Sequence, residues 1–199
     1  MGYRTHKECR NQNSLDSLVV LWEYNNLSST LLKKYKYGLA TEIEKTIEEL
    51  MKYRLKEIPT ITNNINALCI PVPVSHRRLM ERGFNQTENI TRCISNILNI
   101  NFSKEVICRR DGEDIHQSLL DRSERIENKI GFYISNYEIL KDIDEILIVD
   151  DVITTGSTIE QISEIIKSFD KNIKVRGVCL FRGRPYFNKK GEAKTSPKI

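Results

Sequence analysis

Residues 146–158 read ILIVDDVITTGST, and this stretch decides the fold class of the chain. Four aliphatic residues lead directly into two aspartates, and a short run of threonines, a glycine and a serine follows. A continuous aliphatic run, rather than an alternation of apolar and polar residues, is typical of a strand that is covered on both faces. The stretch therefore predicts a central strand of a parallel sheet that ends in a polar loop.

The elements predicted around this strand alternate along the chain. Short apolar runs predict strands at residues 19–24, 67–70, 105–108, 131–135, 145–149 and 173–181. Apolar residues at helical spacing predict helices at residues 27–37, 42–55, 84–98 and 157–169. Because strands alternate with helices, we expect an α/β fold with a mainly parallel sheet flanked by helices.

Two local patterns set boundaries in this arrangement. Pro71 and Pro73 follow the apolar run at 67–70, and since proline cannot donate to a sheet ladder, we expect that strand to end there. Ser157 and Glu160 form the Ser-x-x-Glu pattern of a capping box, which predicts that the last helix begins at Ser157.

The composition is that of an ordinary globular domain. The chain has 199 residues, of which 39% are hydrophobic and 29% charged, and this fits one domain that buries a core. No apolar run approaches the ~20 residues that a membrane span needs, so we expect no membrane insertion. The polar N-terminus lacks the apolar segment of a secretory signal. The cysteines form no CxxC pair, which favours a reducing, cytoplasmic location; they are Cys9, Cys69, Cys93, Cys108 and Cys179.

The net charge of +4 is unevenly distributed. Residues 182–199 carry six lysines and arginines against one glutamate, whereas the rest of the chain is close to neutral. This basic tail could bind nucleic-acid phosphates in a salt-sensitive way without reading their sequence. A solvated chain end is the simpler interpretation.

The polar loop after the aliphatic run combines three features of a phosphate site. A helix N-terminus offers unpaired backbone N–H groups and a partial charge of about +0.5. Gly156 allows the backbone to come close to an anion. The loop and the first helical turn add hydroxyl donors from Thr154, Thr155, Ser157 and Thr158. We therefore predict that residues 154–158 hold a phosphate group.

Asp150 and Asp151 precede this loop at the carboxyl end of the predicted strand, where ligands of open parallel sheets gather. Two carboxylates ~4 Å apart repel each other by about 4 kcal/mol at an effective dielectric constant near ~20. Vicinal ribose hydroxyls or a hydrated Mg²⁺ would satisfy both groups. The alternative is that the aspartates form local turns and that the threonines only cap the helix.

The order of these pieces, four apolar residues, two acids, two apolar residues and TTGST, resembles the signature of type I phosphoribosyltransferases. That family binds 5-phospho-α-D-ribosyl 1-pyrophosphate (PRPP) together with Mg²⁺. The resemblance implies a type I phosphoribosyltransferase-like fold with a small N-terminal hood. It also implies that Asp150 and Asp151 contact the ribose hydroxyls and Mg²⁺. The 5-phosphate would then be held by Thr154, Thr155, Gly156, Ser157 and Thr158.

A second stretch, PVPVSHRRLMERGFNQ at residues 71–86, combines a strand end, a cationic loop and the start of a helix. It is similar to the competence protein ComF family, in which a proline-rich strand end is followed by basic residues and RGFNQ. A third stretch, HQSLLDRSERIENKIGFYIS at residues 116–135, resembles the same family, and the likeness covers roughly residues 18–185. The cationic loop is expected to bind the pyrophosphate of PRPP through His76, Arg77, Arg78 and Arg82. The alternative is a surface loop with scattered arginines.

The resemblance also implies a reaction, the displacement of Mg²⁺-pyrophosphate from C1 of the ribose by a nitrogen of an unidentified base or amine. Cationic side chains that bind the departing pyrophosphate would lower the barrier, and the candidates are Arg82, Arg109 and Arg110. Residues 109–120 resemble the loop that closes over PRPP in type I relatives. Further candidates from this polar region are His116, Arg122 and Arg125. Ion pairs with neighbouring acids are the alternative for these loop arginines.

The ComF resemblance leaves a second function open. That family is implicated in the uptake of single-stranded DNA during natural transformation. The chain could therefore be a non-catalytic PRPP sensor, or could handle single-stranded DNA together with competence proteins.

Many ComF relatives begin with a four-ligand zinc module. Only His6 and Cys9 resemble part of it here, and two ligands do not close a zinc site. We expect an N-terminal tail at residues 1–17, a phosphoribosyltransferase-like domain at 18–185 and a basic tail at 186–199.

Overall fold

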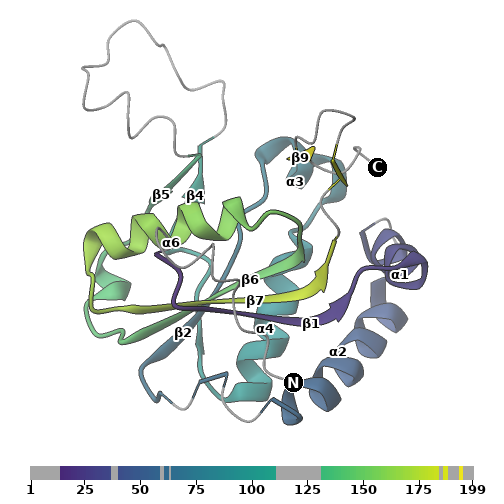
Figure 1. The fold of residues 1–199 in the computed structure, drawn as a ribbon, viewed down its shortest axis with the longest axis horizontal. Coiled ribbons are helices and arrows are strands. Elements are labelled where there is room, and N and C mark those ends of the chain that lie inside the picture. Colours follow the sequence, from purple (N-terminus) through teal and green to yellow (C-terminus); the bar gives the residue numbers. More distant parts are fainter. Residues whose placement is uncertain are drawn as a thin grey trace, which may run out of the picture.

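A parallel five-stranded sheet organises the protein (Figure 1). The computed structural model describes residues 14–36, 40–58, 61–62, 64–110, 131–183, 186–187 and 193–194. The strands lie in the order β1-β7-β6-β2-β3, and all neighbours pair in parallel. They are β1 (Ser17–Glu23), β2 (Ala67–Pro71), β3 (Asn101–Phe102), β6 (Glu145–Ile153) and β7 (Lys174–Arg182). The prediction of an α/β fold with a mainly parallel sheet flanked by helices is confirmed.

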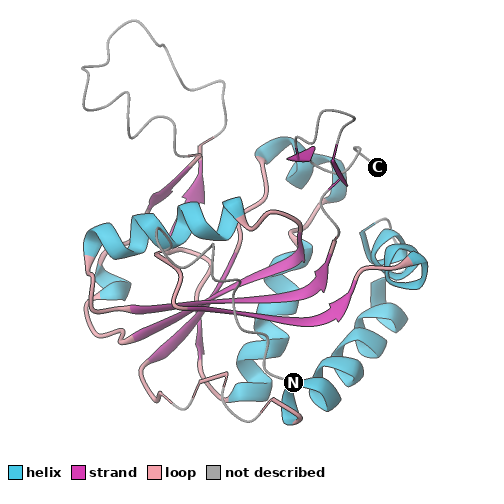
Figure 2. Ribbon diagram, viewed as in Figure 1, coloured by secondary structure: helices cyan, strands magenta, loops and turns pink. Residues whose placement is uncertain are grey.

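Helices cover both faces of this sheet (Figure 2). One face packs against α1 (Asn26–Lys36), α2 (Ala40–Lys56) and α4 (Gln86–Leu98). The opposite face carries α6 (Ser157–Phe169), the antiparallel pair β4 (Ile107–Arg109) and β5 (Phe132–Ile134), and the 3-10 helix η2 (Glu138–Leu140). The short helix α3 (His76–Arg82) and the pair β8 (Tyr186–Phe187) and β9 (Ala193–Lys194) complete the described elements. Within the described ranges, no helix combines the length and the apolar character that crossing a bilayer would require.

Strand β6 shows why this sheet is buried on both faces. Ile146 and Ile148 join the core beneath α6, whereas Leu147 and Val149 join the core beneath α1, α2 and α4. All four side chains are 0% exposed. Successive side chains of a strand point to opposite faces, so the continuous aliphatic run fills two cores. Burying each of these side chains contributes about 1.5–3 kcal/mol to folding.

The chain connections reverse direction between β2 and β6. From β2 the chain passes through α4 to β3 at one edge, whereas from β6 it passes through α6 to β7 on the other side. Right-handed crossovers that run in opposite directions place their helices on opposite faces of a sheet. The carboxyl ends of β2 and β6 therefore lie at the topological switch point, which is where open α/β sheets bind ligands.

Two differences between the predicted and observed elements bear on the site. Residues 76–82 form α3 where a loop was predicted, because Ser75 Oγ accepts a hydrogen bond from Arg78 N (3.4 Å) and Gly83, with φ of 75°, ends the helix. The helix buries none of its side chains, so the sequence shows no apolar periodicity there. Strand β6 extends four residues beyond its predicted end at 149, because β7 pairs with it as far as Ile153.

Helix α6 begins at Ser157, as predicted, but it does so without a capping box. Its N-cap is Gly156, and no side chain caps the helix. Glu160 instead turns toward the N-terminal segment, where its Oε1 accepts hydrogen bonds from Ser14 N (2.6 Å) and Ser14 Oγ (3.0 Å). The capping-box prediction is wrong because Gly156 occupies the N-cap position, so Ser157 is the first helical residue, and Glu160 Oε1 accepts hydrogen bonds from Ser14 instead.

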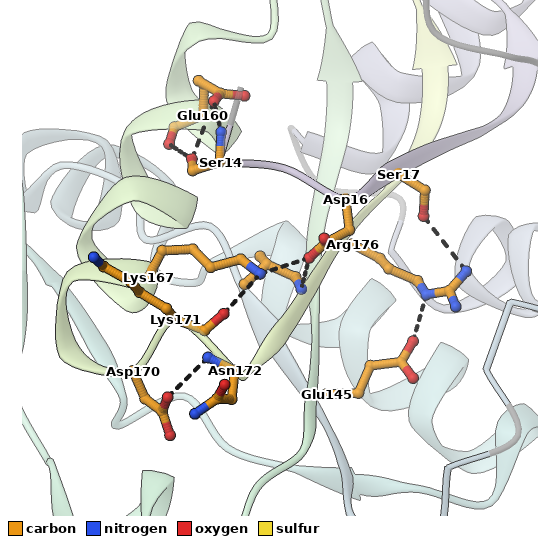
Figure 3. A network of polar contacts seen from close by, with 11 residues as sticks. Ser14, Asp16, Ser17, Glu145, Glu160, Lys167, Asp170, Lys171, Asn172 and Arg176 are labelled. Atoms are coloured by element: carbon orange, nitrogen blue, oxygen red, sulfur yellow. Dashed lines mark hydrogen bonds and ion pairs between the residues drawn. The ribbon is translucent and has the colours of Figure 1, made fainter. Parts of the chain in front are cut away.

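A polar network fastens residues 14–17 to α6 and β7 (Figure 3). Asp16 Oδ2 lies 2.9 Å from Lys167 Nζ of α6 and accepts a hydrogen bond from Val175 N of β7 at 2.7 Å. Nearby, Arg176 of β7 pairs with Glu145 at the start of β6. Because parallel strands begin on the same side, the contacts of Asp16 with β7 and of Arg176 with Glu145 lie at the amino end of the sheet, opposite the switch point, whereas Ser14 contacts the first turn of α6.

Candidate functional site

The predicted site lies where β6 extends past its neighbour β2. The β2 ladder ends with the pair Pro71 and Val149, as the prolines predict, whereas β7 continues beside β6 to Ile153. Val72 N still donates a hydrogen bond to Val149 O at 2.9 Å before the chain leaves the sheet. The last residues of β6 thus project beyond β2 at the switch point.

Asp150 and Asp151 occupy this projecting part and point to opposite faces of β6. Cys179, which pairs with Asp150 across the ladder, belongs to the core beneath α6. Asp151 instead contacts Gln86, the first residue of α4. The alternation of the strand therefore separates the two charges.

Both aspartates also bond to the backbone that follows them. Asp150 Oδ1 accepts a hydrogen bond from Asp151 N at 2.8 Å, and Asp151 Oδ1 accepts one from Val152 N at 2.8 Å. Local hydrogen bonds of this kind are expected if the aspartates form turns, but here both residues belong to strand β6. Asp150 is half-buried and Asp151 is 8% exposed.

Cys179 is a buried, apolar neighbour of Asp150. Its side chain is 0% exposed. Burial, followed by the nearby carboxylates of Asp150 and Asp151, raises the pKa of the Cys179 thiol well above its ordinary value. Because the thiolate is the nucleophile and the metal ligand, a thiol held in its protonated form serves neither purpose.

The loop between β6 and α6 has a tight backbone turn followed by a helix N-terminus. Gly156 has φ of 84°, a left-handed conformation that other residues rarely adopt. Ser157 N lies 3.4 Å from Thr155 Oγ1, and the hydroxyl oxygens of these two exposed residues are 3.1 Å apart. Thr154 and Thr158 are half-buried. The hydroxyl groups thus gather at the start of α6, and their phosphate role stays a prediction.

Gly183, which follows β7, contacts the loop between β6 and α6. Its N–H donates a hydrogen bond to Ile153 O at 2.8 Å. A Cβ atom at position 183 would lie 3.1 Å from Thr154 Cγ2, so glycine permits this close approach. The role of Gly183 could not be predicted, because nothing in the local sequence shows which loop it meets.

A hydrogen-bonded chain joins α3 to Asp151. Arg82 Nη1 donates to Gln86 Oε1 at 3.0 Å, and Gln86 Nε2 donates to Asp151 Oδ2 at 3.2 Å. Gln86 is 3% exposed, so its contact with Asp151 is shielded from water, whereas its contact with the half-buried Arg82 is only partly shielded. Gln86 ends the RGFNQ motif, but its role could not be predicted, because its contact joins residues 65 positions apart.

Neighbouring contacts hold Gln86 in place. Asn85 caps α4, since its Oδ1 accepts a hydrogen bond from Thr87 N at 3.0 Å and its Nδ2 donates to Val72 O at 3.4 Å. The Tyr35 hydroxyl of α1 donates to Gln86 O at 3.4 Å. The end of β2, α1 and α4 therefore fix the position of this glutamine together.

The predicted pyrophosphate ligands all lie on α3. His76, Arg77 and Arg78 are exposed, and Arg77 Nε pairs with Glu81 Oε1 at 2.8 Å. Arg82 is half-buried and connects to Asp151 through Gln86. The structure thus connects Arg82 indirectly to one predicted ribose ligand, Asp151, and the pyrophosphate role of all four residues stays a prediction.

Arg109 and Arg110, predicted to be catalytic, lie on the β4–β5 stem beside α6 (Figure 1). The Arg109 guanidinium carbon is 5.5 Å from the centroid of the Phe132 ring, and that of Arg110 is 5.6 Å from the Tyr133 ring. Both are cation–π contacts with the partner strand, and the catalytic role remains a prediction. Several other candidates lie outside the described residues, namely His6, Cys9, His116, Arg122 and Arg125.

The end of β6 suits a magnesium ion that arrives with a phosphorylated ligand. Asp150 and Asp151 offer carboxylate oxygens, which Mg²⁺ prefers. In the part of the chain that the structure describes, no group of three or more His, Cys, Asp or Glu side chains could hold a metal ion. Mg²⁺ is usually bound through one or two carboxylates together with ligand phosphates, and a single aspartate of this strand end would be enough for that mode.

Fold and site together define an α/β protein with paired carboxylates and a glycine-containing loop at the switch point of a parallel sheet. Competence protein F of Haemophilus influenzae is 27% identical to the chain over 170 residues, which are 83% of this chain and 73% of that protein. DNA utilization protein YhgH of Escherichia coli O157:H7 is 28% identical over 150 residues, 75% of this chain and 65% of that protein. Competence protein ComFC of Streptococcus pneumoniae is 24% identical over 152 residues, 74% of this chain and 60% of that protein.

These relatives support the ComF family that the sequence motifs resemble. No family model matches the chain. The chain spans about three quarters of Competence protein F and less than two thirds of the YhgH and ComFC proteins named above.

Proposed function

We propose that this protein binds PRPP at the carboxyl ends of β2 and β6 and transfers the phosphoribosyl group to a nitrogen of a base or amine. One observation carries the proposal. Asp150 and Asp151 lie directly before a left-handed glycine and a helix N-terminus, at the switch point of the sheet. The diol of a ribose 5-phosphate would face the two carboxylates, and its phosphate would face the glycine turn and the helix N-terminus.

The described residues divide the work of the reaction. Residues 154–158 bind the 5-phosphate through hydroxyl and N–H groups, and Asp150 and Asp151 accept hydrogen bonds from the ribose hydroxyls. Mg²⁺, when bound, supplies positive charge at the pyrophosphate. Arg82 binds the pyrophosphate more tightly as negative charge develops on it, and this lowers the barrier to breaking its bond to C1.

Calorimetry with PRPP and Mg²⁺ tests the binding step, and pyrophosphate release across a panel of bases and amines tests transfer. Wild-type protein is expected to bind PRPP and to release pyrophosphate with at least one acceptor. The matched control is the double variant Asp150→Asn with Asp151→Asn, which is expected to lose binding while keeping its circular dichroism spectrum. A wild-type chain that does not bind PRPP would show the proposal to be wrong.

The names of the relatives favour a second candidate, in which the protein handles single-stranded DNA with competence proteins and does not turn over PRPP. The cationic side chains of α3 and of residues 182–199 would then contact phosphates, and binding would weaken steeply with salt. Binding of a labelled single-stranded oligonucleotide at two salt concentrations tests this candidate. PRPP binding without pyrophosphate release, together with salt-sensitive DNA binding, would favour it over the transferase.

A further inference from the structure

We infer that Gln86 couples the two halves of the PRPP site, so that the ribose affinity at Asp151 depends on Arg82. The inference rests on the proposed function, which assigns the ribose to Asp151 and the pyrophosphate to Arg82. Gln86 acts as a positioning residue, since it contacts both of these side chains and is 3% exposed.

The amide of Gln86 has one favourable orientation between its two partners. A guanidinium only donates hydrogen bonds, so Arg82 Nη1 (3.0 Å) requires the oxygen Oε1 to face it. An ionised carboxylate only accepts, so Asp151 Oδ2 (3.2 Å) requires the nitrogen Nε2. Without the guanidinium, the amide loses the contact that holds Oε1 away from the Asp151 carboxylate.

Asp151 therefore receives an N–H from Gln86 because Arg82 holds the other end of the amide. Asp151 is 8% exposed, and its Oδ1 already accepts a hydrogen bond from Val152 N. These two donors hold the carboxylate in one position, from which its oxygens are proposed to accept from a ribose hydroxyl.

Arg82 can serve the amide and the pyrophosphate together. A guanidinium has five N–H donors, and the contact with Gln86 uses one of them. An anion bound to other donors of this group would fix the arginine, and the arginine would fix Gln86 and Asp151. The two ends of PRPP would then support each other's binding through protein side chains, in addition to their covalent connection.

Ribose 5-phosphate tests this coupling because it lacks the pyrophosphate that Arg82 is proposed to bind. Calorimetry with ribose 5-phosphate and Mg²⁺ is carried out on wild-type protein, on Arg82→Met, on Gln86→Met and on the double variant. Hydrogen bonds to charged groups of this kind correspond to about a tenfold change in affinity. We expect each single substitution to weaken ribose 5-phosphate binding about tenfold, and the double variant to be within about threefold of either single one, since the residues act as a unit.

Two further variants separate coupling from a general loss of structure. Arg82→Lys keeps a donor for Gln86 Oε1 and is expected to restore ribose 5-phosphate affinity to within about threefold of wild type. This comparison still tests the coupling if Gln86→Met fails to fold. Arg92→Met removes a cation on α4 that pairs with Glu88 at 2.9 Å, and it is expected to leave the affinity unchanged.

Unchanged ribose 5-phosphate affinity in Arg82→Met would overturn the coupling while leaving the proposed function intact. The coupling would also be overturned if the losses from the two single substitutions added up in the double variant. Failure of Arg82→Lys to recover ribose 5-phosphate affinity would overturn it as well. If wild-type protein binds neither ribose 5-phosphate nor PRPP, the proposed function itself is wrong and the coupling falls with it.

Discussion

Asp150 and Asp151 are adjacent in the chain, yet Asp150 faces the α6 side of β6 beside Cys179, whereas Asp151 faces Gln86 of α4. Substituting them singly should therefore have different consequences. Asp151→Asn removes the charge that Gln86 donates to, and we expect the free energy of unfolding to fall by about 1–2 kcal/mol. Asp150→Asn, at a half-buried position, should change it by less than ~0.5 kcal/mol.

Both single variants should weaken PRPP binding by about tenfold or more if the aspartates accept ribose hydroxyls. Urea unfolding measures the difference in stability, and calorimetry measures the affinity. Unchanged PRPP affinity in both variants would exclude the diol role, whatever happens to stability.

Gly156→Ala should damage the phosphate loop specifically. Its φ of 84° costs a side chain about 1–2 kcal/mol, and the new Cβ would lie 3.3 Å from Ile153 Cδ1. Gly83→Ala is the matched control, since Gly83 has φ of 75° but a Cβ added there would meet no atom within 4 Å. We expect both variants to lose about 1–2 kcal/mol in urea unfolding. Gly156→Ala should weaken ribose 5-phosphate binding more than Gly83→Ala, which strains the end of α3 beside Arg82 without touching the loop, and equal affinities in the two variants would contradict the phosphate role of the loop.

The buried thiol of Cys179 should make stability depend on alkaline pH. Because folding raises its pKa, mainly through burial, the contribution to stability is present below the ordinary thiol pKa of about 8.5 and declines as the pH rises above it. Each pH unit costs up to about 1.36 kcal/mol for one such thiol. Urea unfolding between pH ~7.5 and ~9.5 should show a shallower decline for Cys179→Ala than for wild type. Parallel curves would show that this thiol does not titrate differently in the folded state.

The central sheet could be predicted from sequence because its signal is local. The run from Ile146 to Val149 is continuous and aliphatic, and each of its side chains is fully buried in one of two cores. Pro71 marked the end of β2 because a proline lacks the N–H that a ladder needs. Apolar residues at helical spacing predicted α6 at 157–169, which are its bounds in the structure, although the capping box did not form.

The parts that could not be predicted depend on contacts between distant segments. Gln86 reaches Asp151 across 65 residues, and Ser14 reaches Glu160 across 146. No periodicity or spacing encodes such pairs, since they follow from strand order and register. Helix α3 was missed for another reason, because caps alone define a helix that buries no side chain.

The last prediction concerns the contacts that attach the N-terminal segment to the sheet. These contacts should affect the stability of the protein but not its function. Asp16 pairs with Lys167 at 2.9 Å, with side chains 37% and 21% exposed, and also accepts a hydrogen bond from Val175 N. Asp16→Asn should therefore lower the free energy of unfolding by about 1 kcal/mol, since it weakens an ion pair and a charged hydrogen bond together.

The control for this substitution is Glu138→Gln, whose ion pair with Lys141 is shorter, at 2.6 Å, but has side chains 77% and 60% exposed. We expect that variant to differ from wild type by less than ~0.5 kcal/mol, because solvent screens exposed pairs. PRPP affinity should be the same in both variants, because Asp16 lies at the amino end of the sheet and the proposed site at the carboxyl end. Urea unfolding and calorimetry on the two proteins check both statements, and a loss of affinity in Asp16→Asn would mean that the two ends of the sheet are linked.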